Sequence, residues 1–298
     1  MIAKHSQVRE ASLALLNPRG NLGTTALDPF ILPLPVVSYS VLVACEGEAS
    51  ETLEVLNMAA LENFQFEATA VCRFTADAVT FFENYDSDEE EPLLAFDFSV
   101  VADIFGRLTS LILTRVSFTK EDCQELFAST PLIKSLRLFV TSRCNSRNPK
   151  HPFKFIVYHP KAMNEDFMDL FSDLPAEDNI RSNNFILPRL EDLHLFHPCH
   201  INDGKLLKQA KRYNKLIKTR AGLSAKSQSH LLSRSGSDVA DQPSFQFTLS
   251  FSEEHNMRAD IPLVMRELNG TAEKLRHVCI VDVGYKIVDT FEWRPEAQ

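Results

Sequence analysis

The side chains best suited to chemistry gather in the stretch HLFHPCH, which contains His194, His197, Cys199 and His200. Imidazole nitrogens and thiolate sulfurs are zinc ligands, so this composition raises the question of a metal site. In an extended strand, however, Leu193 and Leu195 would point toward the core and His194 away from it. All four ligands would also come from one short segment, whereas tetrahedral sites usually draw on separate segments. We therefore predict a strand end followed by a polar loop, with no metal and no cofactor.

Short motifs of common catalytic and nucleotide-binding sites are absent from the sequence. It contains no G-x-S-x-G, no H-E-x-x-H, no G-x-x-x-x-G-K-[ST] and no G-x-G-x-x-G. With nine Gly among 298 residues, phosphate-binding loops are not expected. We predict that the chain is not an enzyme and has no catalytic residues. The alternative is an α/β hydrolase or transferase whose active site is assembled from scattered residues.

The overall composition restricts the compartment and the class of partner. A net charge of −9 argues against nucleic acid as the main partner. The six cysteines are scattered without a C-x-x-C pair, which favours a reducing compartment over a disulfide framework. The first 20 residues lack the apolar core of a signal peptide, and no stretch approaches the ~18 apolar residues of a membrane span. We expect a cytoplasmic or nuclear protein without membrane contact.

Residues 203–220 are predicted to form a basic amphipathic helix. Residues 200–235 contain nine Lys or Arg and one Asp, a net charge of +8. Leu206, Ala210, Tyr213 and Ile217 fall on one helical face. Most of the basic side chains lie elsewhere and form a basic patch of Lys208, Lys211, Arg212, Lys215 and Lys218. This patch allows three interpretations: a solvated outer helix, a nuclear-localisation or acidic-partner patch, or a calmodulin-like target helix. A regulatory protein acting through this helix is therefore a second alternative function.

Leucine-spaced segments recur along the chain and indicate how it is built. Leu108, Leu111 and Leu113 form an L-x-x-L-x-L core, and Ile133, Leu136 and Leu138 repeat it 25 residues later. This period is within the about 20–29 residues of leucine-rich repeats. Further copies begin at Leu61, Leu190 and Leu275, which gives intervals of 47, 25, 57 and 85 residues. The long intervals require insertions or a missed repeat, and a mixed α/β domain with chance leucine spacing is the alternative. We predict an α/β fold: an irregular leucine-rich-repeat-like solenoid with a parallel sheet and outer helices.

Local signals place the remaining elements and the domain boundaries. A capping box of Thr119 and Asp122 predicts a helix that ends before Pro131. Other helices are expected after Thr75, after Asn164, and from Asp260 to Asn269-Gly270, and a strand is expected at 245–251. The predicted divisions are an irregular segment at 1–35, the solenoid at 36–202, the basic helix and a Ser-rich flexible linker at 203–244, and a C-terminal repeat or cap at 245–298.

Four stretches together resemble the leucine-rich-repeat part of fungal F-box proteins: LTSLILTRVSFT, TPLIKSLRLFV, LPRLEDLHLF and LRHVCIVDVGYKI. The resemblance covers roughly residues 53–290. It implies a substrate receptor of a ubiquitin ligase, in which the F-box binds an adaptor subunit and the repeats bind the target. Residues 1–50 show no Leu-Pro-x-Glu-like start of an F-box. Target binding is therefore what the resemblance implies here, and the adaptor is expected as a partner only if an F-box lies upstream.

Residues that flank the core leucines of a repeat strand face the concave side, where solenoids bind their partners. This rule predicts a partner-binding surface of ten residues: Asn63, Gln65, Ser110, Ile112, Ser135, Arg137, Phe139, Asp192, His194 and Phe196. Phe beside Arg is a combination that is frequent at interfaces. The alternative is that inserted segments cover Phe139 and Phe196. The sequence thus predicts a non-catalytic intracellular module that recruits an unidentified protein partner.

Overall fold

The computed structural model describes part of the chain at the level of single residues. The described ranges are 9–15, 36–43, 47–48, 60–75, 94–99, 102–117, 120–139, 170–172, 186–197, 208, 210–223, 245–252 and 261–286. The sequence also contains an acidic run at 86–91, a polar stretch at 141–152 that indicates an insertion, and a strand-like stretch at 153–158. All three lie outside these ranges, as do the helix predicted after Thr75 and most of the Ser-rich linker.

The chain is a mixed α/β protein that divides into two compact units, Met1–Leu193 and His194–Gln298. The boundary lies within strand β8 (Asp192–His197), so its first two residues belong to the first unit and the others to the second. The predicted basic helix and the predicted C-terminal cap both belong to the second unit.

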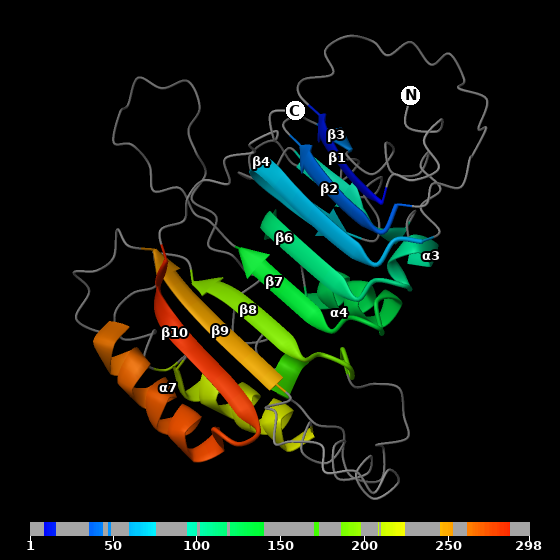
Figure 1. The fold of residues 1–298 in the computed structure, drawn as a ribbon. Helices are drawn as coiled ribbons and strands as arrows, with labels where there is room; N and C mark the ends of the chain where they lie inside the picture. Colours follow the sequence, from blue (N-terminus) through cyan, green and yellow to red (C-terminus); the bar gives the residue numbers. More distant parts are fainter. Residues whose placement is uncertain are drawn as a thin grey trace, which may run out of the picture. The chain divides into compact units, whose positions relative to one another are not determined.

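Parallel strands form the first unit. In spatial order they are β1 (Glu10–Leu15), β2 (Ser38–Val43), β4 (Asn63–Thr75), β6 (Ser110–Ser117), β7 (Ser135–Phe139) and the start of β8. Two short strands, β3 (Gly47–Glu48) and β5 (Leu94–Asp97), pair with each other to one side, and β5 also pairs with β4. Figure 1 shows the strands lying side by side and pointing in the same direction.

One backbone hydrogen-bond arrangement repeats at the start of each of these strands. The carbonyl of Arg9 accepts from the N–H groups of Val37 and Ser38, at 2.8 and 3.0 Å. The same pair of hydrogen bonds recurs from strand to strand along the sheet. The carbonyl of Val37 accepts from the N–H groups of Glu62 and Asn63, that of Glu62 from Thr109 and Ser110, that of Thr109 from Lys134 and Ser135, and that of Lys134 from Glu191 and Asp192. The strand starts are therefore aligned although they lie 28, 25, 47, 25 and 57 residues apart.

Apolar side chains follow the same alignment and form the core. Tyr39, Phe64, Leu111 and Leu136 are paired in register and buried, and Leu193 is buried at the start of β8. Val36, Leu61, Leu108, Ile133 and Leu190 form a second buried row before the strands. The L-x-x-L-x-L spacing therefore correctly predicted the buried positions at Leu61, Leu108, Ile133 and Leu190.

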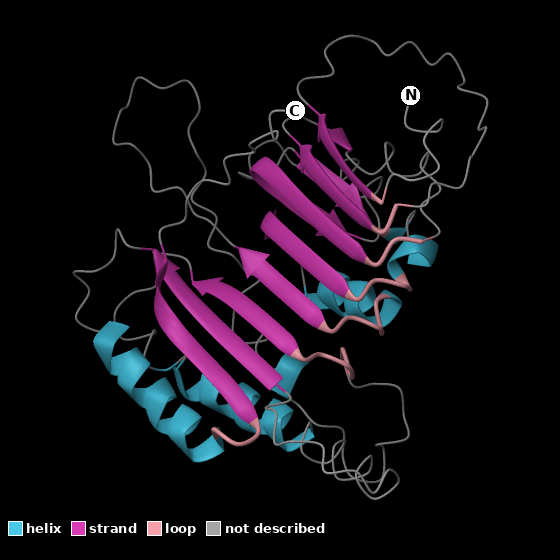
Figure 2. Ribbon diagram, viewed as in Figure 1, coloured by secondary structure: helices cyan, strands magenta, loops and turns pink. Residues whose placement is uncertain are grey.

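Helices cover one face of these strands (Figure 2). Helix α3 (Ala102–Phe105) places the Phe105 ring 5.2 Å from that of Phe64, measured between centroids. Helix α4 (Lys120–Ser129) lies within the predicted bounds and buries Cys123, Leu126 and Phe127, as expected from their spacing. Residues 170–172 are helical, and Phe171 packs edge-on against Phe127 at 5.4 Å.

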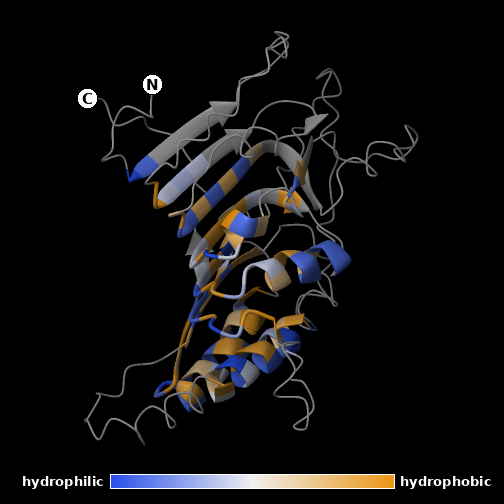
Figure 3. Cartoon of the chain, turned by 90° about the vertical axis from the view of Figure 1, so that its right-hand side faces the viewer, coloured by the Kyte–Doolittle hydropathy of each residue, from blue (hydrophilic) through white to orange (hydrophobic). Residues whose placement is uncertain are grey.

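The second unit combines the rest of β8 with β9 (Phe245–Ser252), β10 (Cys279–Lys286) and two helices. Strands β9 and β10 are parallel, with Cys279 opposite Phe245. Residues 210–223 are helical, and α7 spans Ile261–Leu275. Tyr213 of the first helix packs against Phe247 of β9, with ring centroids 5.9 Å apart. Hydrophobic and hydrophilic residues alternate along the helices of this unit (Figure 3), so they are amphipathic.

Three local predictions were wrong. Residues 10–15 form β1, although 1–35 was predicted to be irregular, because strand pairing with β2 outweighs the nearby Pro and Gly. Helix α7 continues through Asn269-Gly270 to Leu275, because Ile261, Val264, Leu268 and Thr271 form one uninterrupted buried stripe. In β10 the buried residue is Cys279, whereas Ile280 is exposed, so the predicted core positions Val278 and Ile280 are shifted by one residue.

Thr75 is the last residue of β4, and the helix predicted after it lies outside the described residues. One smaller boundary differs from the prediction. Residues 221–223, predicted as the start of the flexible linker, continue the helix that begins at 210, because Ala221 is buried against the unit. In the described part of the chain, no helix is long and apolar enough to cross a membrane.

Truncation of Leu111 should destabilise the first unit. Leu111 is fully buried in the middle of the apolar row, so Leu111→Ala should lower the free energy of unfolding by about 2–5 kcal/mol through the cavity it leaves. Ile112→Ala is the control, because Ile112 lies on the opposite face of the same strand and is half-buried. Ile112→Ala should lower the free energy of unfolding by less than about 1 kcal/mol. Urea unfolding followed by circular dichroism measures both, and equal losses would contradict the assigned faces.

The thiols of Cys123 and Cys279 should resist alkylation in the native protein. Burial raises the pKa of Cys279 to about 12, and burial followed by the nearby Asp122 carboxylate raises the pKa of Cys123 well above its usual value. Thiolate is the reactive form, so iodoacetamide at pH 8 should modify both cysteines only after unfolding in urea. Mass spectrometry of the labelled peptides measures this.

The same raised pKa values predict a direction for stability against pH. In the unfolded chain the two thiols ionise near their ordinary pKa of about 8.5, while in the folded chain they stay protonated. Their contribution to stability is therefore complete below pH ~8.5 and is lost as the pH rises toward the folded pKa values. The urea midpoint should accordingly fall between pH 8 and pH 10.5, and Cys279→Ala should reduce this fall. An unchanged slope in that variant would contradict the prediction.

Candidate functional site

Polar side chains, with the apolar Ile112 among them, form two rows on the strand face opposite the apolar core of the first unit. The first row contains the residue that starts each strand: Ser38, Asn63, Ser110 and Ser135. The second row lies two residues further along each strand: Ser40, Gln65, Ile112 and Arg137. We call these two rows, together with Asp192, the polar strand face. None of its members is fully buried, so it is open to contact.

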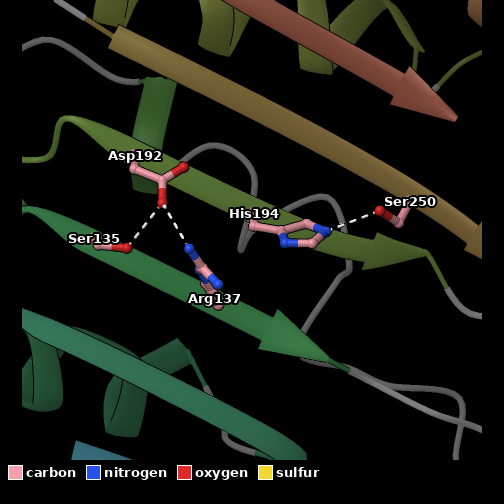
Figure 4. A network of polar contacts seen from close by, with 5 residues as sticks. All are labelled: Ser135, Arg137, Asp192, His194 and Ser250. Carbon is pink, nitrogen blue, oxygen red and sulfur yellow. Dashed lines mark hydrogen bonds and ion pairs between the residues drawn. The ribbon is translucent and has the colours of Figure 1, made fainter. Parts of the chain in front are cut away.

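Hydrogen bonds link neighbouring strands within the first row. The Nδ2 group of Asn63 donates to Ser38 Oγ at 3.1 Å. At the other end, Ser135 Oγ donates to Asp192 Oδ2 at 2.9 Å. Arg137 Nη2 lies 3.8 Å from the same carboxylate oxygen, and Figure 4 shows both groups approaching Asp192. These contacts fix the positions of polar groups at both ends of the row.

Arg137 is the most available charged group of the polar strand face. Its side chain is 47 % exposed, and its partner Asp192 is 25 % exposed. A surface ion pair of this kind adds little stability, about 0–1 kcal/mol. The guanidinium therefore stays available for a partner, because little free energy is lost when it turns from Asp192 to a new acceptor.

Eight of the ten predicted contact residues lie on the first unit, and seven of these belong to the polar strand face: Asn63, Gln65, Ser110, Ile112, Ser135, Arg137 and Asp192. Phe139 occupies a third row, opposite Thr114, and its side chain is outside the described residues. His194 and Phe196 are only 8 % and 3 % exposed. Their prediction as an exposed contact surface is wrong, because strand alternation gives the direction of a side chain and not what covers it.

Ser38 and Ser40, which were not among the predicted contact residues, extend the polar strand face by one strand. A signal for them exists in the sequence. Val36, Tyr39 and Val41 repeat the spacing of the core, so the residues between them occupy the same positions as Asn63 and Gln65. Aromatic Tyr39 in place of leucine concealed this copy.

In the second unit, a histidine and a serine form a close buried pair. His194 Nε2 lies 2.8 Å from Ser250 Oγ (Figure 4). Such a contact between a base and a hydroxyl is the first requirement of a serine nucleophile. Ser250, however, is only 1 % exposed, so a substrate carbonyl cannot reach its oxygen in this arrangement. We interpret the hydrogen bond as structural: it pairs two polar groups that would be costly to bury alone.

The predicted basic patch lies along the helix at 210–223 and just before it. Ala210, Tyr213 and Ile217 are buried, as their spacing predicted, and Leu206 is outside the described residues. Lys208, Lys211, Lys215 and Lys218 are exposed, and Arg212 is half-buried. Arg220, which the sequence analysis did not distinguish, is buried, and burial lowers its pKa to about 9. It therefore remains charged at neutral pH.

No group of three or more metal-ligating side chains occurs among the residues that the structure describes. His194, the first member of the HLFHPCH cluster, is engaged with Ser250. Cys199 and His200 lie outside the described ranges.

The Ser250→Ala substitution should destabilise the protein, and Ser250 itself should not react as a nucleophile. It leaves His194 without its hydroxyl partner in a buried position, which should lower the free energy of unfolding by about 1–3 kcal/mol. A fluorophosphonate probe, which labels activated serines, should not modify Ser250 in the native protein. Mass spectrometry checks this, and stoichiometric labelling that disappears in Ser250→Ala would instead support the hydrolase alternative.

Comparison of the chain with protein-family models, with curated proteins and with solved structures found no match.

Proposed function

We propose that this chain is a non-catalytic protein-binding module that recruits a partner through the polar strand face. The observation on which this depends is the alignment of accessible, mostly polar side chains from successive parallel strands, over Asn63–Ser110–Ser135 and Gln65–Ile112–Arg137. A mixed polar surface made from several neighbouring strands suits a protein partner better than a small substrate, which needs a concave site.

A solenoid of leucine-rich-repeat type is the architecture that we propose for the first unit. Support comes from the five double hydrogen bonds before the strands and from the apolar row behind them. In such proteins each repeat contacts mainly its neighbours, so the strand face is continuous and tolerates insertions between repeats. The long intervals before β6 and β8 are then insertions, the first of which contains β5.

The resemblance to F-box proteins adds a more specific hypothesis. Under this hypothesis, the polar strand face binds a protein that is to be ubiquitinated. The chain is then the target-binding part of a ubiquitin-ligase substrate receptor. A ligase adaptor would be a further partner only if an F-box precedes residue 1. The binding hypothesis does not depend on the ligase hypothesis, so the two can be tested separately.

The Arg137→Glu substitution should remove partner binding without unfolding the chain. It reverses the charge of the most exposed group on the polar strand face and repels Asp192 only at the surface. The tagged full-length protein is used to capture partners from lysate, with quantitative mass spectrometry of the bound proteins. We expect at least a tenfold loss of the specific partner, which corresponds to about 1.4 kcal/mol.

Arg189→Glu is the matched control for this experiment. Arg189 is exposed on the turn that precedes β8, within the same unit, and is not part of the polar strand face. The Arg189→Glu variant should capture the same proteins as the wild type. If both variants capture the wild-type set in equal amounts, the polar strand face is not the binding surface. Recovery of a ligase adaptor with an N-terminally extended chain, and not with this one, would support the F-box hypothesis.

A further inference from the structure

The second unit contains a cleft between the helix at 210–223 and α7. Its volume is about 350 Å³, within the range of about 300–1,000 Å³ of ligand pockets. Both helices contribute side chains to its walls: Asn214 and Lys218 from the first, and Leu263, Arg266, Glu267, Gly270, Thr271 and Lys274 from α7. All of these belong to one compact unit, and only Lys218 is shared with the predicted basic patch.

Gly270 leaves the middle of this cleft open. It lies in the interior of α7, where Gly lowers helix stability relative to Ala. A Cβ atom at this position would meet no atom within 4 Å, so packing does not require the missing side chain. The absence of a side chain here is instead what keeps the wall of the cleft hollow.

Asn214, which lines this cleft, has a buried amide oxygen without a partner in the described part of the chain. Asn214 is only 6 % exposed, and its Nδ2 group donates to Glu267 Oε1 at 3.1 Å. Because a carboxylate only accepts hydrogen bonds, the amide nitrogen must face Glu267 and the oxygen is left over. Asn214 Oδ1 makes no hydrogen bond to the described residues. Buried acceptors are nearly always paired, so this oxygen is a candidate acceptor for a donor that enters the cleft.

Positive charge dominates the rim. Lys218, Arg266 and Lys274 line the cleft together with a single carboxylate, that of Glu267. All three cations are exposed, and no ion pair of theirs occurs within the described residues. Leu263, 45 % exposed, adds an apolar contact at the same rim. The cleft therefore offers anion-binding groups, a hydrogen-bond acceptor and an apolar surface.

We propose that this cleft binds an acidic peptide segment of a partner protein. Acidic side chains of the peptide pair with Lys218, Arg266 and Lys274, and a backbone N–H of the peptide donates to Asn214 Oδ1. An aliphatic side chain of the peptide covers Leu263. A simple anion such as phosphate would satisfy the cations and leave both Asn214 Oδ1 and Leu263 unused, so the combination favours a peptide. This site is independent of the polar strand face.

Fluorescence anisotropy with the full-length chain tests the proposal. The probe is a fluorescein-labelled peptide of sequence Glu-Glu-Leu-Glu-Glu-Leu, and the reference peptide replaces each Glu by Gln. The acidic probe should bind at least tenfold more tightly than the reference, and its affinity should fall with added salt because the attraction is electrostatic. Equal affinity for both peptides would overturn the proposal.

Two glycine variants separate loss of the site from loss of the fold. Gly270→Leu fills the cleft, so it should weaken probe binding at least tenfold while the thermal unfolding temperature stays equal or rises. Gly222→Leu is the matched control: Gly222 is also helical, a Cβ there also meets no atom within 4 Å, and it does not line the cleft. If the two variants bind the probe equally well, the peptide does not occupy this cleft.

Charge variants distinguish a specific site from general attraction to a basic surface. Arg266→Gln should weaken binding about tenfold. Arg276→Gln should leave it nearly unchanged, because Arg276 is an exposed cation of the same unit that lies outside both the cleft and the predicted basic patch. Equal losses would overturn the proposal in favour of a diffuse basic surface. Displacement of the probe by inorganic phosphate at equal concentration would also overturn it, because a simple anion would then be sufficient.

Discussion

A carbonyl oxygen that accepts two successive N–H groups is the interaction on which the first unit depends. It occurs before β2, β4, β6, β7 and β8, with distances between 2.7 and 3.0 Å. A carbonyl has two lone pairs, so it can satisfy two donors at a turn where neither would otherwise have a strand partner. Each such bond aligns the first residue of one strand with that of the next. Since a slip of one residue would exchange the two faces of a strand, this alignment determines which side chains enter the core.

The aligned core then accommodates long intervals between strands. Phe64 is stacked on Tyr39 of the preceding strand, and it also contacts Phe105 of α3 and Phe96 of β5. Both of these rings come from the 47-residue interval between the starts of β4 and β6. The added chain therefore increases the buried aromatic area behind the strands without disturbing their pairing. The length of an interval is for this reason a poor criterion for repeats, and the L-x-x-L-x-L spacing a better one.

Spacing within single strands was the part of the fold that could be predicted from the sequence. It identified the core residues of β4, β6 and β7 and most of the polar strand face, because alternation along a strand is a local property. The bounds of α4 followed from its capping box and from Pro131, which are local signals as well. What depends on distant packing could not be predicted. No residue near His194 or Phe196 in the sequence indicates that these side chains are buried. Asn269-Gly270 is typical of a helix end, and only the buried residues before and after it show that α7 continues. In β10, the pairing register with β9 decides whether Cys279 or Ile280 points into the core. Both residues are apolar, so the sequence alone does not distinguish the two registers.

The two units differ in which of their surfaces is accessible to a partner. This difference follows from how far their strands are buried. In β6 the core residues Leu111 and Leu113 alternate with Ser110 and Ile112, which are half-exposed, so stability and contact use opposite faces of one strand. In β9 most residues of both faces are buried, Phe247 and Leu249 on one side and Thr248 and Ser250 on the other, while Gln246 near the start is exposed. A strand that is covered on both sides cannot present a binding surface. The cations and the unpaired amide oxygen of the cleft are instead on the helices of the second unit, while β10 exposes Ile280 and Asp282.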